Sequence, residues 1–320
     1  MSPDTDADTR RDSCSDRARL GAPDRRREAQ VNPHAPPLLA IQSEFPHPRS
    51  LLRLQEPPDS CHTALSKQVF DGSYGKPFIV ESGLHRFLHF DLDCVQSAMR
   101  VDNPHELTLA YTRRMMAFLL FNRTPHRILM LGLGGGSLAK FCYQRLPAAR
   151  VTAVEINPNV IALREEFHIP ADDDRFRVIC ADGARYVTDL PSCKDIILSD
   201  ACDRAGVAPE LDATEFYQNA RRCLTREGVF VANICGDLYG RATHVLRIRE
   251  VFGDGLLTLQ TGKLGNTIVL AFKETVPQID WQKLNDAARD LTRDFGIDFS
   301  RYLRRIDRDW KLRRQLSRSH

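Results

Sequence analysis

The sequence predicts an α/β fold built on a mostly parallel sheet, and three observations support this prediction. A short apolar run at residues 128–131 ends in a cluster of glycines and is followed by a helical pattern. Similar runs occur at residues 151–154, 177–179 and 195–198, and such continuous apolar runs are typical of strands buried on both faces. The last two apolar runs share a glycine-containing connection and predict a hairpin that closes the sheet.

The two ends of the chain are rich in charge and poor in large apolar side chains. Residues 1–45 combine Arg, Asp and Pro in a composition that cannot bury enough surface to fold, so we expect a disordered tail. Residues 299–320 are basic and predict a helical or flexible tail whose charges face water. Between these tails we expect a small β-strand module at residues 46–102 and an α/β domain at residues 103–298.

The expected β module contains two strand signals and leads into a helical segment. Residues 78–80 form a short apolar run. Residues 85–94 alternate between two sets of side chains, and a period of two over this length predicts one strand with two different faces. At residues 103–122 the apolar spacing becomes helical, and Pro104 and Glu106 suit a first turn.

The glycine cluster after residues 128–131 predicts a tight turn that lies against a ligand. Its members are Gly132, Gly134, Gly135 and Gly136. Glycine suits such a turn because it has no Cβ to obstruct a sharp bend or a close ligand. Helical spacing follows at residues 138–146, and Pro147 ends it. The predicted unit is therefore a strand, a glycine turn and a helix.

An acidic residue, Glu155, stands at the end of the next apolar run. A carboxylate about 20 positions after a glycine turn suits a ribose, because it accepts hydrogen bonds from both ribose hydroxyls. We therefore expect a nucleoside-type ligand, and the alternative is a plain strand–helix–strand turn with a surface glutamate. Asn157 and Pro158 then predict a helix that runs to about Phe167.

Further acidic residues follow the third and fourth predicted strands. Asp182 comes shortly after residues 177–179, and Asp200 and Asp203 come shortly after residues 195–198. In open α/β sheets, ligands bind beyond the carboxyl ends of the strands. The sequence therefore predicts an anionic pocket at this edge, although aspartates in loops also cap nearby backbone amides.

The remaining segments complete the sheet and decide its type. They are a helix at 214–224, a strand at 228–234, a helix at 239–252, paired strands at 256–261 and 266–272, and a helix at 280–295. A sheet that ends in such a hairpin indicates a class I methyltransferase-like, Rossmann-like fold rather than a nicotinamide-binding one, whose sheet stays parallel to its edge.

Composition excludes several classes of protein. The chain has 320 residues, 42% of them apolar, and its net charge of +3 does not point to a nucleic-acid partner, so we expect none. No apolar run approaches the length of a membrane span, and the N-terminus lacks the apolar segment of a signal peptide. We therefore expect no membrane association and a cytoplasmic location. The nine cysteines include no CxxC pair, so we expect reduced thiols rather than a disulfide framework or a metal site.

Four sequence blocks follow the predicted strands in a fixed order. They read GLGGGS at 132–137, VEIN at 154–157, ADGARYV at 181–187, and DACDRAGVAPEL followed by EFY between 200 and 217. In order and spacing they resemble the blocks GGGDGG, VEID, GDG and DSSDPxGPA…EFY of the polyamine aminopropyltransferase family, the spermidine and spermine synthases. The resemblance extends from about Gly72 to Lys273.

This resemblance implies where a nucleoside co-substrate binds. Glu155 would hold the ribose of decarboxylated S-adenosylmethionine, and Asp182 and Gly183 would face the adenine, beside the four glycines of the turn. Gln96 looks like the family's glutamine near the tail of this ligand. The resemblance implies no permanently bound cofactor.

It also implies how the second substrate, a small-molecule amine, is held. Asp200 would be the carboxylate that takes the proton of the reacting amine, with Asp203 as a second carboxylate. Tyr111 looks like the tyrosine of the family's YHE or YQE helix. By the same resemblance we expect a homodimer.

The chain departs from the family pattern at three places, which involve four residues. Gly135 replaces the aspartate of the glycine block, Thr112 and Arg113 replace the polar and acidic pair after the tyrosine, and Arg204 replaces a proline. Each change removes negative charge, or adds positive charge, near the amine site. The nucleoside half of the predicted site is therefore retained, whereas the amine half is altered.

These departures leave three functions open. The first is an aminopropyltransferase with a different or less basic acceptor, which the paired Asp200 and Asp203 favour. The second is a methyltransferase or other group transferase that uses S-adenosylmethionine, whose carboxylate would suit Arg113. The third is a catalytically silent relative that binds a nucleoside or a protein partner.

Overall fold

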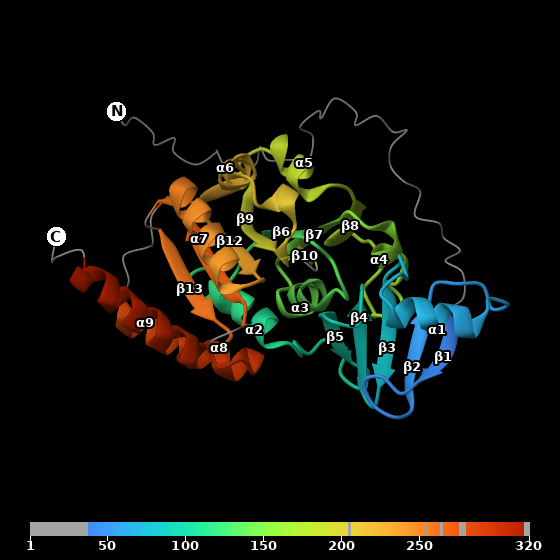
Figure 1. Cartoon of the computed structure of the whole chain (residues 1–320). Coiled ribbons are helices and arrows are strands. Elements are labelled where there is room, and N and C mark those ends of the chain that lie inside the picture. Colours follow the sequence, from blue (N-terminus) through green and yellow to red (C-terminus); the bar gives the residue numbers. More distant parts are fainter. Residues whose placement is uncertain (1–37, 204–205, 254, 263–264, 275–279, 317–320) are drawn as a thin grey trace, which may run out of the picture. The chain divides into compact units, whose positions relative to one another are not determined.

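The computed structural model describes residues 38–203, 206–253, 255–262, 265–274 and 280–316. They form a five-stranded sheet, a seven-stranded sheet and a short two-stranded ladder (Figure 1). Residues 1–37 of the predicted tail lie outside the described residues. Residues 39–43 of the segment predicted as a tail instead form the strand β1 (Leu39–Ser43). This part is ordered because the side chains of Leu39 and Ile41 pack into the apolar cluster on one face of the first sheet.

The first sheet is antiparallel, and its strands follow one another in chain order. They are β1, β2 (Ser50–Leu54), β3 (Phe78–Ser82), β4 (His85–His89) and β5 (Val95–Arg100). The helix α1 (His62–Phe70) contributes Val69 to the apolar cluster on one face of this sheet. The sequence interpretation included no helix here. Ile79, Leu88 and Met99 on the opposite face join the core of the second sheet.

One strand prediction in this module was too long. Residues 85–94 were expected to form a single strand, but β4 ends at His89 and a turn leads into β5. The carboxylate of Asp91 accepts hydrogen bonds from the backbone amides of Asp93 (2.9 Å) and Cys94 (3.2 Å). Such an Asx turn reverses the chain, so the alternation in the sequence spans the end of one strand and the turn that follows it.

The second sheet is mostly parallel and has the order β13-β14-β12-β9-β6-β7-β8. Its strands are β6 (Arg127–Leu131), β7 (Arg150–Glu155), β8 (Phe176–Cys180), β9 (Lys194–Ser199), β12 (Leu224–Ile234), β13 (Leu256–Gln260) and β14 (Thr267–Phe272). Its two antiparallel pairings are those of β14 with β12 and with β13. This topology confirms the predicted methyltransferase-like sheet with a C-terminal hairpin.

Helices cover both faces of the second sheet (Figure 1). The first face packs against α2 (Ala110–Met115), the 3-10 helix η1 (Met116–Leu120), α3 (Ser137–Arg145), α4 (Pro158–Ala162), α8 (Trp281–Phe295) and α9 (Phe299–Leu316). The second face packs against α5 (Gly183–Thr188), α6 (Thr214–Cys223) and α7 (Leu238–Phe252). In β6, Ile128 and Met130 enter the first core, whereas Leu129 and Leu131 enter the second. A strand buried on both faces needs this unbroken apolar run.

Two helix predictions were also too long. Residues 103–122 were expected to be helical, but α2 begins at Ala110. Glu106 lies in a turn instead, where its amide donates a hydrogen bond to the carbonyl of Asn103 (3.1 Å) and its carboxylate pairs with Arg100 (3.2 Å). The helix predicted from Asn157 to about Phe167 begins as expected, since the Asn157 side chain accepts a hydrogen bond from the Asn159 amide (2.9 Å). It ends at Ala162 because the chain then turns toward the first sheet.

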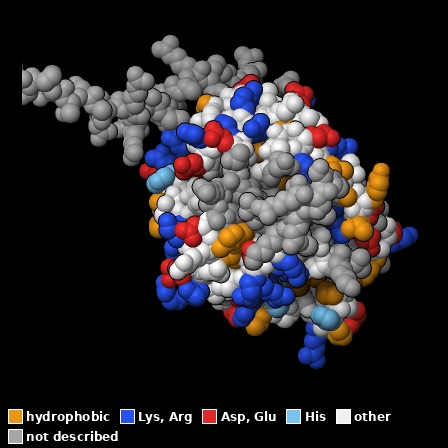
Figure 2. Space-filling model, turned by 90° about the vertical axis from the view of Figure 1, so that its left-hand side faces the viewer, with side chains coloured by type: hydrophobic (Ala, Val, Ile, Leu, Met, Phe, Trp, Pro, Cys, Tyr) orange, Lys and Arg blue, Asp and Glu red, His pale blue; other side chains and the backbone are white. Residues whose placement is uncertain are grey.

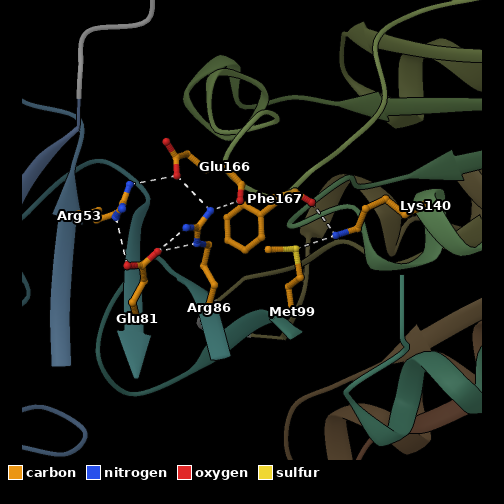
Figure 3. A network of polar contacts seen from close by, with 7 residues as sticks. All are labelled: Arg53, Glu81, Arg86, Met99, Lys140, Glu166 and Phe167. Carbon is orange, nitrogen blue, oxygen red and sulfur yellow. Dashed lines mark hydrogen bonds and ion pairs between the residues drawn. The ribbon is translucent and has the colours of Figure 1, made fainter. Parts of the chain in front are cut away.

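A polar network joins the two sheets at this turn (Figure 3). Glu166, which follows α4, pairs with Arg53 of β2 (3.2 Å) and with Arg86 of β4 (3.0 Å). Glu81 of β3 pairs with the same two arginines, with its contact to Arg53 at 3.3 Å. Because each carboxylate meets two guanidinium groups, the network holds the turn after α4 against the first sheet.

The surface of the described residues carries charges of both signs. On the face shown in Figure 2, acidic and basic side chains are interspersed, and hydrophobic side chains form separate small groups. Within the described residues, no helix combines the length and the apolar character needed to cross a membrane.

Lys140 of α3 is fully buried beside the polar network of Glu166. Its ammonium nitrogen donates a hydrogen bond to the carbonyl oxygen of Phe167 (2.6 Å) and contacts the sulfur of Met99 (3.1 Å) (Figure 3). Burial, assisted by the positive charge of Arg86, lowers the pKa of Lys140 to about 7. The unfolded chain therefore binds a proton at Lys140 that the folded chain has lost at any pH between about 7 and the ordinary lysine value near ~10.4.

Lys140→Met should change how stability depends on pH. Because the unfolded wild-type chain binds the extra proton, its free energy of unfolding gains about 1.4 kcal/mol per pH unit above pH 7 from this residue, and the variant lacks this gain. Urea unfolding at pH 7, 8 and 9 should therefore show a difference that grows in favour of the wild type. Lys67→Met, at an exposed lysine of α1, is the control. Parallel pH profiles for wild type and Lys140→Met would contradict the shifted pKa.

Candidate active site

A cavity of about 650 Å³ opens at the carboxyl edge of the second sheet. This volume is in the range of small-molecule sites. The candidate residues from the sequence that line it are Gln96, Tyr111, Gly132, Gly134, Glu155, Asp182, Gly183 and Asp200. Gly135 and Gly136 do not line the cavity, and the side chain of Asp203 lies outside the described residues.

The glycine turn brings the end of β6 against the end of β9. Gly132 has a φ of +94°, and a Cβ built on it would lie 2.2 Å from the backbone oxygen of Asp200. The Asp200 amide donates a hydrogen bond to the carbonyl of Leu131 (2.9 Å). Any side chain at position 132 would therefore push the two strand ends apart, which explains why the turn needs glycine here.

Glu155 fastens the same turn from the end of β7. One carboxylate oxygen accepts a hydrogen bond from the Leu133 amide, and the other accepts one from the Asn157 amide, both at 2.9 Å. The side chain is 8% exposed and faces the cavity. A carboxylate has about four acceptor positions, so Glu155 keeps capacity for hydroxyl groups of a ligand.

The structure gives a reason for the missing aspartate of the glycine block. A Cβ at Gly135 would lie 2.7 Å from the hydroxyl of Ser97 and 2.9 Å from the ring of Phe167. Ser97 is a buried residue of β5, and its hydroxyl lies 3.4 Å from that of Ser137. The first sheet therefore occupies the space that a side chain at position 135 would need.

Asp182 lies at the N-terminus of α5 and caps this helix. Its Oδ1 accepts hydrogen bonds from the amides of Ala184 (2.8 Å) and Arg185 (3.2 Å). The capping role that the sequence left open is therefore real, and Asp182 also lines the cavity. One oxygen caps the helix, and the other lies 3.6 Å from the guanidinium of the exposed Arg185, a weak surface pair that a ligand can displace.

Asp200 is held by two hydrogen bonds in the wall of the cavity. Its Oδ2 accepts a hydrogen bond from the hydroxyl of Tyr111 (3.2 Å), and its Oδ1 accepts one from the side-chain amide of Asn233 (2.8 Å). Burial raises the pKa of Asp200 above its ordinary value, and these two donors partly offset the rise. Burial and the charge of Asp200 raise the pKa of Tyr111, so this tyrosine stays protonated and remains a donor.

Asn233 was absent from the candidates that the sequence suggested. It is the second-to-last residue of β12, is 4% exposed, and accepts a hydrogen bond from the side chain of Asn266 (2.9 Å). A single polar residue inside the apolar run at 229–234 was the available signal. Asn233 and Asn266 therefore form a chain of hydrogen bonds that fixes the orientation of the Asp200 carboxylate.

Arg113 does not line the cavity. Its guanidinium donates hydrogen bonds to the carbonyl oxygens of Leu107 and Thr108, the latter at 2.8 Å. Within the described residues no Lys, Arg or His side chain lines the cavity, whereas four carboxylates do, from Glu155, Asp182, Asp200 and Glu210. The interior therefore favours cationic ligands.

One expectation about the cysteines was wrong. Cys202, at the start of β10 (Cys202–Asp203), forms a disulfide with Cys235, the residue after β12. The spacing of 33 residues carries no signal for this pair, because only the neighbouring positions of β9 and β12 in the sheet bring the cysteines together. The structure describes free thiols at Cys61, Cys94, Cys142, Cys180 and Cys223.

The segment after β10 completes the wall. The strand β11 (Gly206–Val207) pairs with β10, and the 3-10 helix η2 (Pro209–Leu211) brings Glu210 and Leu211 to the cavity. Among the described residues, no group of three or more His, Cys, Asp or Glu is arranged to hold a metal ion.

Comparison with known proteins identifies the family. Residues 108–239 match the family model of the spermine/spermidine synthase domain. The chain is 37% identical over 229 residues to the polyamine aminopropyltransferase of Chromobacterium violaceum, an alignment that covers 71% of this chain and 88% of that protein. The chain belongs to the polyamine aminopropyltransferase family. The resemblance inferred from the sequence blocks is confirmed, and the protein is a transferase.

Solved structures share the fold. The spermidine synthase of Thermotoga maritima aligns with a TM-score of 0.53 at 17% identity, covering 81% of this chain and 88% of that one. Human methyltransferase-like protein 13 in complex with SAH aligns with a TM-score of 0.52 at 26% identity, covering 58% and 92%. The methyltransferase-like fold predicted for this chain is thus shared by a spermidine synthase and by a methyltransferase-like protein.

Gly132→Ala should destabilise the folded protein because the new Cβ would meet the backbone of Asp200. Gly72→Ala is the matched control, since Gly72 also has a positive φ, +74°, but a Cβ added there would meet no atom within 4 Å. Backbone strain alone costs on the order of 1–3 kcal/mol in each variant. Urea unfolding should show a larger loss for Gly132→Ala, and equal losses in the two variants would contradict the importance of the close approach.

Proposed function

We propose that this protein transfers the aminopropyl group of decarboxylated S-adenosylmethionine to an amine. The observation that carries the proposal is the cavity itself, which four carboxylates line and, among the described residues, no basic side chain. Both proposed substrates are cations, a sulfonium with a free ammonium and a protonated amine. Carboxylate walls raise the local concentration of such ligands.

The nucleoside would bind along the glycine turn. Glu155 has acceptor capacity left for the ribose hydroxyls, and Asp182 and Gly183, at the start of α5, would face the adenine. Gln96 of β5 reaches the same cavity from the first sheet and would lie near the aminopropyl tail. Gly132 and Gly134 would let the backbone lie against the ligand.

The reaction needs an unprotonated amine aligned with the sulfonium. An amine with a pKa near ~10 must first lose a proton, and Asp200 would accept it. The nitrogen lone pair then attacks the methylene carbon by which the aminopropyl group is bound to sulfur. This carbon–sulfur bond breaks, and its electron pair stays on sulfur as methylthioadenosine leaves. The raised pKa of Asp200 makes it a better proton acceptor than an exposed aspartate.

The acceptor is proposed to carry less charge than a diamine. The family's aspartate in the glycine block is absent here, and Ser97 takes its space. The side chains that are hydrogen-bonded to Asp200, Tyr111 and Asn233, are both uncharged. We therefore expect monoamines or singly charged amines among the acceptors. Asp203, as a second carboxylate, would weaken this preference because it could also bind the second ammonium group of a diamine. The cytoplasmic location and the homodimer stay predictions.

Methyl transfer from S-adenosylmethionine is the second candidate. It is favoured by the similarity to methyltransferase-like protein 13, which was solved with SAH. The sequence supported methyl transfer through Arg113, as a partner for the carboxylate of S-adenosylmethionine. In the structure the Arg113 guanidinium instead donates hydrogen bonds to the carbonyl groups of Leu107 and Thr108, and it does not line the cavity. The aminopropyl reaction is therefore the better supported of the two.

A direct assay distinguishes the two reactions. The protein is incubated with a panel of monoamines and diamines and either decarboxylated or intact S-adenosylmethionine. We expect methylthioadenosine from the decarboxylated donor with at least one amine. Formation of S-adenosylhomocysteine from the intact donor, without methylthioadenosine, would instead identify a methyltransferase.

Asp200→Asn should abolish proton transfer while retaining the shape of the side chain. We expect kcat/KM to fall by on the order of 100-fold or more, as for loss of a general base. Binding of methylthioadenosine, measured by calorimetry, should stay within the range of the wild type. Asp286→Asn, at an exposed aspartate of α8, serves as the control. Full turnover in Asp200→Asn would reject the assigned role.

Tyr111→Phe should shift the pH profile in a direction set by the hydrogen bond it removes. The tyrosine stabilises the ionised form of Asp200, so its loss should raise the pKa of Asp200 further. Activity requires the ionised carboxylate and is lost as the pH falls through this pKa. The acidic limb of kcat/KM for one amine should therefore move to higher pH, and a limb that stays in place or moves to lower pH would contradict the contact.

A further inference from the structure

The disulfide between Cys202 and Cys235 lies in the wall of the cavity, next to the residues that hold Asp200. Cys202 follows Asp200 by two positions, and Cys235 follows Asn233 by two positions. Asn233 donates the 2.8 Å hydrogen bond to Asp200. The disulfide and this hydrogen bond therefore tie the same two segments together, the chain after β9 and the end of β12.

The bridge is open to small molecules. Cys202 and Cys235 are both half-buried, and both line the cavity. A reductant that enters the cavity can therefore reach the sulfur atoms. At least five other cysteines remain free thiols in the same structure, so the chain is not a disulfide-stabilised framework. In a cytoplasmic protein, as the sequence predicts, a disulfide of this kind is usually transient or redox-sensing rather than structural.

We propose that Cys202 and Cys235 form a thiol–disulfide exchange site that controls the amine half of the cavity, with a small dithiol as its reactant. The proposal rests on the proposed function for its effect on catalysis, but not for the exchange itself.

The exchange step is balanced in atoms and electrons. A thiolate of the dithiol attacks one sulfur of the bridge, the sulfur–sulfur bond breaks, and the leaving sulfur takes a proton. The second thiol of the reductant then displaces the remaining protein sulfur. The protein gains two electrons and two protons as two thiols, and the dithiol becomes a cyclic disulfide.

Reduction should act on the amine side more than on the nucleoside side. With the bridge closed, Cys202 is fixed to the end of β12, and Asp200 stays between Tyr111 and Asn233. With the bridge open, the segment after Asp200 loses its covalent tie to β12, so the carboxylate is less well oriented toward the amine. Glu155 is held by Leu133 and Asn157, whose contacts the bridge does not touch.

The first test does not depend on turnover. Protein purified without reductant is digested under non-reducing conditions, and mass spectrometry should find the peptide containing Cys202 linked to the one containing Cys235. After dithiothreitol treatment, hydrogen exchange should become faster at the amide of Asp200, which the closed state bonds to Leu131. Absence of the link even after incubation with oxidised glutathione, or unchanged exchange on reduction, would overturn the proposal.

The second test measures the consequence for the enzyme. Reduction should raise the KM for the amine severalfold and leave the Kd for methylthioadenosine unchanged. Cys235→Ser should show the high KM in both redox states, and Cys61→Ser, at an exposed cysteine before α1, should respond like the wild type. A reduction effect of equal size in Cys235→Ser would overturn the proposal. Failure of all turnover in both states would instead reject the proposed function and leave the first test to decide on the exchange site.

Discussion

The backbone crossing between Gly132 and Asp200 is the constraint on which the rest of the site depends. β6 and β9 pair in parallel as far as Leu131 and Ser199, and the next residue of each strand lies against the other. A Cβ at Gly132 would lie 2.2 Å from the Asp200 oxygen, so the two backbone segments lie too close together for any side chain at position 132. This contact positions the glycine turn beside the carboxylate that is proposed to take the proton of the amine.

The carboxylates around the cavity serve the fold as well as the proposed ligands. Glu155 accepts hydrogen bonds from two backbone amides, and Asp182 accepts two at the start of α5. Asp200 is held by Tyr111 and Asn233. A carboxylate that is already hydrogen-bonded stays oriented without a ligand, so less ordering remains to be done when a substrate binds.

The first sheet completes the site from outside the parallel sheet. β5 brings Gln96 to the cavity and fills the space next to Gly135 with Ser97. The same sheet is fastened to the turn after α4 by the arginine pairs of Glu166 (Figure 3). None of the members of this network lines the cavity, so it holds the first sheet in place without contributing to the cavity wall.

The sequence alone determined the seven-stranded fold and the family, because both depend on local patterns: continuous apolar runs, the glycine turn, and blocks that follow strand ends. It misjudged lengths where a short-range polar contact lies at a turn that residue periodicity does not report. Asp91 turns the chain after β4, and Glu106 pairs with Arg100 where a helix was expected.

Only the tertiary structure decided which groups meet. It paired Asn233 with Asp200, joined Cys202 to Cys235, turned Arg113 away from the cavity and buried Lys140 between the sheets. The first two of these contacts join the ends of β9 and β12, which are neighbours in the sheet order but not along the chain. Neither residue spacing nor periodicity reports such distances, since both describe one segment at a time, whereas a contact depends on the packing of two.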